Sequence, residues 1–332
     1  MQNQDHRRGF FKRVKLMAAG AMGAPLALAS GVPAQETRSL PSARGSLAKT
    51  PNGFVHPHRV LLWENTRKEY RELQESGQLK AAILPTGSIE QHNEHMAMVA
   101  DVAIATLISQ KAALDLYPHV IVAPPSPCGY APYHMARPGT LTLRKETFLA
   151  YILDVMSCLK AHGVRTIMIL NGHGGNHHPI QEALPKFRSE LGINIDADSY
   201  WTGANREYTS QFMRAKQPTS HAGEFETSIY AAAFPERLRP FTMADYDHAH
   251  LNYESGFSPE IQEFLRRDGR TFKNGRIDAR GENKRDRRRQ EEALLARPET
   301  GEKILSKAIE FVADRVKQMI AATEAGKSWP VS

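Results

Sequence analysis

Short apolar stretches alternate with longer amphipathic segments along the chain from about residue 60 onward. The alternation of presumptive strands and helices predicts an α/β fold with a largely parallel central sheet. Segments with apolar residues three and four positions apart, typical of helices with one buried face, span residues 102–116, 145–162, 179–191, 224–233 and 302–322. Short stretches typical of buried strands span residues 79–84, 120–123, 166–170 and 193–197.

The region from residue 56 to 332 has no internal repeat and no break in composition, so a single domain is expected there. Residues 35–55 are rich in Ser, Pro, Gly and Thr and lack apolar periodicity, which predicts an extended leader. Residues 240–297 show no clear pattern. They include a basic cluster at 266–289, interrupted by acidic residues, that predicts a solvated loop or an oligomer contact.

The N-terminus has the layout of a twin-arginine signal peptide. Residues 7–15 read Arg-Arg-Gly-Phe-Phe-Lys-Arg-Val-Lys, an apolar run follows at 16–29, and Val-Pro-Ala at 32–34 fits a cleavage site. The run is too short and too diluted by Gly and Pro for a membrane span of about 20 residues. We expect residues 1–34 to be removed and the mature chain to be exported by the twin-arginine machinery, to the periplasm or beyond, without stable membrane insertion. The alternatives are an uncleaved N-terminal anchor and a basic tail that arose by chance.

The composition excludes several classes of protein. Of the 332 residues, 41% are hydrophobic and 24% are charged, which excludes a disordered chain, a collagen or a multi-span membrane protein. The two cysteines, Cys128 and Cys158, form no Cys-x-x-Cys pair, which excludes a thiolate zinc finger or a thioredoxin-type site. Much of the net charge of +7 lies in the N-terminal segment, so no nucleic-acid partner is expected.

Three polar clusters lie where a predicted strand ends or a predicted helix begins. The first contains Glu90, His92 and Asp101. Glu90 and His92 are two residues apart, so in an extended segment their side chains point the same way and can share a cation. Asp101 opens the next helix, where the helix dipole favours a negative charge, and it can fold back towards the same point.

The second cluster is Asn-Gly-His-Gly-Gly-Asn at 171–176, and the third is His-Ala-Gly-Glu-Phe-Glu at 221–226. Glu224 and Glu226 diverge by ~200° on a helix, so one of them should face the site. Parallel strands end at one edge of a sheet, where open α/β folds place their sites. Carboxylates and imidazoles without thiolates predict Zn(II), Mn(II) or Fe(II).

Motifs of several other enzyme classes are missing from the sequence. It has no Gly-x-Ser-x-Gly elbow, no Gly-x-Gly-x-x-Gly, no Walker phosphate loop and no His-Glu-x-x-His. Lipase-type serine hydrolases, nucleotide enzymes and zincins are therefore disfavoured. Each cluster alone has an ordinary explanation as a helix cap or a glycine turn, and it is their co-occurrence that favours a metal site.

At these residues the sequence resembles the creatininase (creatinine amidohydrolase) family of metal-dependent amide hydrolases. The resemblance covers most of residues 60–322. It implies a three-layer α/β/α sandwich with a mostly parallel central sheet, two divalent metal ions per chain and, as often in the family, a homohexamer. The matching segments are Leu-Pro-Thr-Gly-Ser-Ile-Glu-Gln-His at 84–92, Asp101, His134 to Pro-Gly-Thr at 138–140, Asn-Gly-His-Gly-Gly-Asn at 171–176, His-Ala-Gly-x-x-Glu-Thr-Ser at 221–228 and Gly-Glu-Lys-Ile-Leu at 301–305.

Carried over onto this chain, the resemblance implies that Glu90 and His173 bind one metal ion, that His92 binds the other and that Asp101 bridges the two. Creatininase itself has a glutamate two residues after the motif histidine, at a position that is glycine in this chain. The glutamate of the motif at 221–228, Glu226, is therefore expected to be the remaining ligand. The identity of that ligand stays open.

The resemblance also implies a mechanism in which a metal-activated water attacks an amide carbonyl. His221 resembles the general acid that protonates the leaving nitrogen, and Glu226 is expected to share in catalysis. Backbone N–H groups of the glycines after the motif histidine are candidate oxyanion donors. Residues expected near the substrate or its oxyanion are Gly174, Gly175, Asn176, His134 and His95.

The substrate is less well specified than the reaction. Creatinine-specific members carry a tryptophan shortly before the motif histidine, but residues 212–220 contain none, and Asn93 and Glu94 replace the usual Gly-Pro. The sequence therefore predicts hydrolysis of a non-peptide or cyclic amide, with creatinine disfavoured. The alternatives are peptide trimming, a lyase or isomerase reaction, and a non-catalytic exported protein that binds metal or ligand.

Overall fold

The computed structural model describes residues 47–135, 139–216, 221–248, 260, 263 and 284–330. The chain divides into Met1–Arg44 and Gly45–Ser332, and all described residues belong to the second unit. The predicted signal peptide therefore lies outside the described residues. So do most of the predicted leader, residues 136–138 of the matching segment that begins at His134, and residues 217–220.

A four-stranded parallel sheet, in the order β4-β3-β5-β6, forms the centre of the fold. Strands β3, β4 and β5 are buried along their whole length, as expected for a parallel sheet covered on both faces. All four predicted strands are confirmed to within two residues at each end. The strands are β3 (Ala81–Thr86), β4 (Val120–Val122), β5 (Thr166–Asn171) and β6 (Asn194–Ser199).

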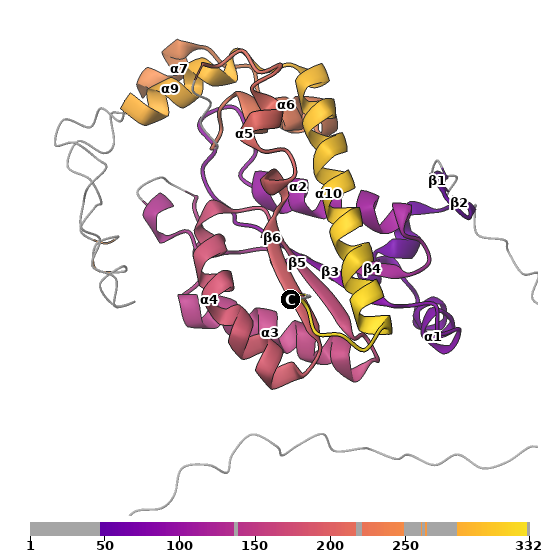
Figure 1. The fold of residues 1–332 in the computed structure, drawn as a ribbon. Coiled ribbons are helices and arrows are strands. Elements are labelled where there is room, and N and C mark those ends of the chain that lie inside the picture. The colour runs from indigo at the N-terminus through magenta and orange to yellow at the C-terminus, as the bar shows by residue number, and fades with distance from the viewer. Residues whose placement is uncertain are drawn as a thin grey trace, which may run out of the picture. The chain divides into compact units, whose positions relative to one another are not determined.

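Helices cover both faces of the sheet, which confirms the predicted three-layer α/β/α sandwich (Figure 1). In β5, Met168 and Leu170 belong to one core, and Ile167 and Ile169 belong to the other, because successive strand residues point to opposite faces. The helices of the first core are α2 (Ala100–Asp115), α6 (Glu224–Ala233) and α10 (Pro298–Glu324), and those of the second are α3 (Lys145–Ala161) and α4 (Gly174–Leu191).

Several shorter elements surround this sandwich. One that the sequence analysis missed is α1 (Arg67–Glu75), which begins with a capping box between Thr66 and Glu69. Among the described residues, no helix has the length and apolar content needed to cross a membrane. The other short elements are η1 (Pro57–Val60), η2 (Leu62–Glu64), η3 (Pro132–His134), η4 (Tyr200–Thr202), η5 (Pro235–Arg237), α5 (Arg206–Thr209), α7 (Met243–His248) and α9 (Lys284–Ala293).

Two boundaries differ most from the prediction. The last part of the expected leader forms an antiparallel hairpin of β1 (Ala48–Thr50) and β2 (Gly53–Val55), and Ala48 and Val55 pack against the first core. Helix α4 begins at Gly174, five residues before the predicted start at Pro179, because His173 takes the N-cap position and the glycines form the first turn. The earlier start matters for the site, since it places His173 at a helix N-terminus.

Candidate metal centre

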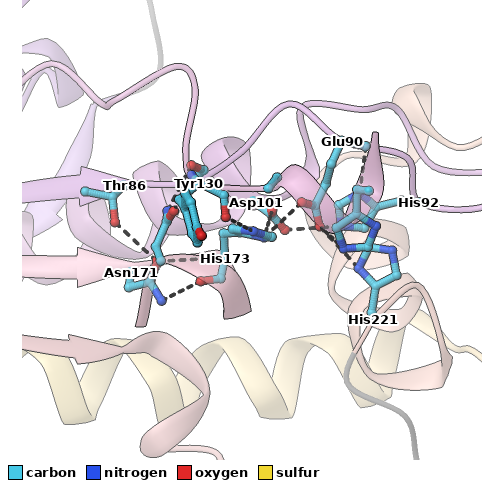
Figure 2. A network of polar contacts seen from close by, with 12 residues as sticks. Thr86, Glu90, His92, Asp101, Tyr130, Asn171, His173 and His221 are labelled. Atoms are coloured by element: carbon cyan, nitrogen blue, oxygen red, sulfur yellow. Dashed lines mark hydrogen bonds and ion pairs between the residues drawn. The ribbon is translucent and has the colours of Figure 1, made fainter. Parts of the chain in front are cut away.

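Two strand ends and two helix N-termini bring acidic and imidazole side chains to the carboxyl-terminal edge of the sheet (Figure 2). Glu90 and His92 follow β3, and His173 follows β5. Asp101 is the second residue of α2, and Glu226 lies in the first turn of α6. All five residues are buried. The location is the edge at which parallel α/β sheets place their sites.

Two glycines allow these segments to approach one another. A Cβ at Gly172, after β5, would overlap the backbone carbonyl of Asp101. A Cβ at Gly87, after β3, would lie 2.5 Å from the backbone nitrogen of Val102. Only glycine therefore lets both strand ends lie against the first turn of α2, where Asp101 is placed.

Asp101 stands between two histidines. Its Oδ1 is 3.1 Å from Nε2 of His92, and its Oδ2 is 3.1 Å from Nδ1 of His173. Oε2 of Glu90 is 3.0 Å from the same Nδ1 of His173, and Oε2 of Glu226 is 3.7 Å from Nε2 of His92. Each histidine therefore faces two carboxylates, and Asp101 is shared by both.

Backbone carbonyls determine which ring nitrogen faces the carboxylates. Nδ1 of His92 lies 3.1 Å from the carbonyl oxygen of Glu90, and Nε2 of His173 lies 3.2 Å from that of Tyr130. A carbonyl oxygen can only accept, so these two nitrogens carry the hydrogens. In the neutral rings, Nε2 of His92 and Nδ1 of His173 then present lone pairs, as metal-binding histidines do.

The donor set fits a pair of metal ions. Both carboxylate oxygens of Glu90 and Oδ2 of Asp101 are buried without a hydrogen-bond partner among the described residues, and buried carboxylates without donors need a cation. Three groups could hold an ion, each with ligand atoms within 4.8 Å of one another: Glu90, Asp101 and His173; His92, Asp101 and Glu226; and Glu90, His92 and His221. The first two groups share Asp101.

The pKa shifts of the buried histidines and carboxylates also indicate that the centre favours positive charge. Burial disfavours the charged forms of His92 and His173, but the neighbouring carboxylates outweigh burial and raise the pKa of each ring to about 10. Burial raises the pKa of Glu226 to about 7. Burial opposes ionisation of Asp101 as well, yet His92 and His173 lower its pKa to about 2. Protons on the two rings thus supply charge that a divalent ion would replace.

Glu224 and Glu226 point in different directions, as their spacing predicts. Glu224 accepts hydrogen bonds from the backbone N–H groups of Arg214 and Ala215, the latter at 2.6 Å, and so anchors the preceding loop. Glu226 faces the centre and accepts a hydrogen bond of 2.6 Å from the backbone N–H of Ala222. Ala222 has a φ of 51°, a conformation that costs roughly 1–2 kcal/mol for a residue with a Cβ. The charge-assisted hydrogen bond to Glu226 offsets that strain.

His221 and His134 lie beside Glu90. Nδ1 of His221 and Nε2 of His134 are both 3.4 Å from Oε1 of Glu90, and the two ring centroids are 4.7 Å apart. Burial, and after it the positive charges of neighbouring histidines and Arg289, hold the pKa of both rings well below the usual value. Both shifts favour the neutral form of the ring.

Two residues expected near the substrate are engaged elsewhere. His95 is bonded to the Thr227 hydroxyl at 2.8 Å and stacks on Phe241, and burial lowers its pKa to about 3. Asn176 donates to the carbonyl of Gly87 at 3.1 Å and accepts from the N–H of Tyr130 at 2.8 Å. The Asn176 amide therefore ties together the loops that carry the centre.

The two glycines of the second cluster have different surroundings. A Cβ at Gly174 would meet nothing within 4 Å. A Cβ at Gly175 would overlap the Tyr133 hydroxyl and would lie 2.5 Å from both Nε2 of His173 and the carbonyl of Tyr130. The Tyr133 hydroxyl is itself 3.1 Å from Nε2 of His173. Gly175 thus makes room for the groups that orient His173.

The sequence analysis missed three residues of the site: Gln91, Tyr133 and Arg289. Gln91 contacts His134 and His221, and Tyr133 contacts His173. Arg289 is on α9 and only 8% exposed, so of the two alternatives predicted for 266–289, a solvated loop or an oligomer contact, the first is wrong at this position; residues 266–283 lie outside the described residues. The sequence did contain one sign that Arg289 is buried. Arg289 and Ala293 are four residues apart, so both lie on the same, buried side of α9.

Residues 63–316 match the family model of creatininase, described as creatinine amidohydrolase. The chain belongs to the creatininase family. A creatinine amidohydrolase of Pseudomonas putida is 26% identical over 279 residues, which cover 80% of this chain and 98% of that protein. A 3-dehydro-scyllo-inosose hydrolase of Thermotoga maritima is 30% identical over 209 residues, which cover 61% of this chain and 64% of that protein.

Solved creatininase structures share the fold. The crystal structure of creatinine amidohydrolase (creatininase) has a TM-score of 0.61 at 25% identity, over 79% of this chain and 98% of that one. A mutant creatininase of Zn-Zn type also has a TM-score of 0.61, at 24% identity over the same shares of the two chains. The segment that matches the creatininase family spans the whole candidate centre, from Glu90 to Glu226.

Proposed function

We propose that this member of the creatininase family is a metal-dependent amidohydrolase that cleaves the C–N bond of a small non-peptide or cyclic amide with water. The observation that carries the proposal is the position of Asp101, whose two carboxylate oxygens face His92 and His173. A shared carboxylate between two neighbouring ligand groups suits a two-metal hydrolase. The family match and the relative named creatinine amidohydrolase support amide hydrolysis, and the relative named 3-dehydro-scyllo-inosose hydrolase supports hydrolysis in general.

Two divalent metal ions per chain fit the centre. Glu90 and His173 would hold one ion, His92 and Glu226 would hold the other, and Asp101 would contact both. The mixture of oxygen and nitrogen donors suits Zn, Mn or Fe(II). Such ions lower the pKa of a bound water and polarise a carbonyl oxygen.

The chain's own side chains then orient the reactants. Nδ1 of the His221 ring faces Glu90, and we propose that His221 protonates the leaving nitrogen. Glu226 also contributes to catalysis, and the hydrogen bond from the backbone N–H of Ala222 holds its carboxylate in position. Tyr133 and the carbonyl of Tyr130 keep the His173 ring in place through its Nε2.

The substrate we propose is a small amide other than creatinine. This rests on the lack of tryptophan at 212–220 and on Glu94, an exposed carboxylate where the family usually has proline. Asn93 has a φ of 54°, a conformation natural to the glycine usual at this position, so the replacement keeps the backbone path and changes the side chain. The difference therefore acts through the size and charge of the two side chains that follow His92.

We further propose that the chain is exported by the twin-arginine route and acts outside the cytoplasm as a homo-oligomer, a hexamer by analogy with the family. The order of basic, apolar and small residues over 1–34 supports export. In this proposal residues 35–55 link the signal to a single catalytic domain at 56–332, with the β1–β2 hairpin resting on that domain.

Hydrolysis in H₂¹⁸O tests the proposal. The enzyme is stripped of metal, reloaded with Zn, Mn or Fe(II), and given linear amides, cyclic amides and short peptides. We expect metal-dependent release of an amine, with ¹⁸O in the carboxylate product. This activity should be lost in Asp101→Asn. It should be retained in Asp154→Asn, a control variant at an exposed carboxylate. Products without ¹⁸O would indicate a lyase or isomerase, cleavage of peptides alone a peptidase, and binding without turnover a carrier.

A further inference from the structure

We propose that Gln91 is a positioning residue that fixes the tautomers of His134 and His221, so that both rings present an N–H group to one point beside Glu90. The inference deepens the proposed function and rests on it, since it gives these rings a shared task at the same centre. The task is to bind an oxygen atom of the substrate in the resting enzyme, before His221 takes up the proton of the attacking water and passes it to the leaving nitrogen.

The backbone fixes the orientation of the Gln91 amide. The N–H of Asn93 donates to Oε1 of Gln91 at 3.1 Å. The left-handed conformation of Asn93, with a φ of 54°, turns the chain back towards residue 91. The N–H of Gln91 is held 3.3 Å from Oγ1 of Thr140. Because a backbone N–H can only donate, the amide oxygen lies on the Asn93 side and the NH₂ group points the other way.

The NH₂ group reaches both histidine rings. Nε2 of Gln91 is 3.0 Å from Nδ1 of His134 and 3.0 Å from Nε2 of His221. An amide NH₂ has two hydrogens to donate and does not accept, so both ring nitrogens are acceptors. In the neutral rings the hydrogens must then sit on the opposite atoms, Nε2 of His134 and Nδ1 of His221.

These two N–H groups converge on one position. Each nitrogen is 3.4 Å from Oε1 of Glu90, longer than the roughly 2.7–3.2 Å of an N–H···O hydrogen bond. The two side chains are 11% and 12% exposed, so the donors lie in a largely dry setting. Neither N–H group is close enough to Oε1 of Glu90 to form a full hydrogen bond with it. Both groups can therefore donate to an oxygen of the substrate, either the amide carbonyl oxygen or the oxyanion that develops from it. With the reverse tautomers, two lone pairs would face that oxygen and repel it.

Two substitutions of Gln91 separate the hydrogen-bond pattern from the space that the side chain fills. Gln91→Glu keeps the size but can only accept, so each ring must turn its N–H towards residue 91 or gain a second proton. Gln91→Met keeps the approximate shape and removes both hydrogen bonds. Gln211→Glu makes the same change of charge at an exposed position and serves as the control.

The test is long-range ¹H–¹⁵N NMR of the zinc-loaded full-length protein with labelled histidine, in which protonated and bare ring nitrogens give separate signals. His134→Asn and His221→Asn assign the two rings. We expect hydrogens on Nε2 of His134 and Nδ1 of His221 in the wild type and in Gln211→Glu. We expect this pattern to change in Gln91→Glu and to be lost or mixed in Gln91→Met.

The kinetic expectation is a fall in kcat of about 10²-fold or more for both Gln91 variants, with a smaller change in KM, as for loss of a positioned oxyanion donor. A wild-type hydrogen on Nδ1 of His134 or Nε2 of His221 would overturn the proposal. So would wild-type tautomers and kcat in Gln91→Met. The NMR readout needs no substrate, so its failure is distinguishable from failure of the hydrolase proposal.

Discussion

Gly301 of α10 lies so close to the backbone carbonyl of Ser228 in α6 that a Cβ at residue 301 would overlap it. Ser228 is two residues after Glu226, on the helix that carries this side chain to the metal centre. The close approach of the two helices therefore sets the position of a candidate ligand, and it depends on the absence of a side chain at Gly301.

Gly301→Ala should destabilise the protein by about 1–3 kcal/mol, because a methyl group cannot be placed there without moving α10 or α6. Urea denaturation of the variant and of Glu302→Ala, at the exposed neighbouring position, measures the effect. The control should change the free energy of unfolding by no more than ~0.5 kcal/mol. Equal stability of the two variants would contradict the packing argument.

Gly175→Ala should weaken metal binding, whereas Gly174→Ala should leave metal content unchanged. At residue 175 the new methyl group would displace the Tyr133 hydroxyl or the His173 ring, and at residue 174 it would meet open space. Loss of groups that orient a metal ligand typically lowers metal affinity about 10–100-fold. Competition with a fluorescent zinc chelator gives the affinities. Equal affinities in the two variants would contradict this account of Gly175.

Glu69→Gln should lower stability at neutral pH by roughly 1 kcal/mol. The backbone N–H of Thr66, together with the Thr66 hydroxyl and Arg59, lowers the pKa of Glu69 to about 2 from 4.5. A carboxyl group whose pKa is lowered by folding stabilises the protein above its unfolded pKa and loses this effect as the pH falls towards the folded value. The difference between wild type and Glu69→Gln should therefore shrink from about pH 4.5 down to about pH 2.

Urea denaturation at several pH values measures that difference. Glu72→Gln, on the same helix and 53% exposed, is the matched control and should show little effect at any pH. A difference for Glu69→Gln that stays constant between neutral pH and pH 3 would contradict the role of its charge.

The sheet and its helices could be predicted because their signals are local. The run at 167–170 is apolar throughout, and the helix at 224–233 has the same bounds in the structure as in the prediction. The start of α4 could not be placed, because Gly174 and Gly175 are poor helix formers and only the packing around His173 selects the helix there. The β1–β2 hairpin was missed because its sequence has almost no apolar pattern.

The candidate centre was predictable in its residue types but not in its supporting contacts. Glu90, His92 and Asp101 occupy spacings that already indicate a shared cation, and the structure brings them together with His173 and Glu226. Gln91 gives no signal, because its partners, His134 and His221, are 43 and 130 residues away. Arg289 was misread because a run of arginines is usually solvated, and only the packing of α9 buries one of them.

The central claim is a two-metal centre organised by Asp101, and metal stoichiometry tests it most directly. Mass spectrometry of the protein, purified without chelators or a histidine tag, should find about two Zn, Mn or Fe ions per chain. The content should fall in Asp101→Asn and His173→Ala and stay unchanged in His178→Ala, a control whose side chain is 82% exposed on α4. A wild-type protein without bound metal, or a metal content indifferent to Asp101 and His173, would contradict the account.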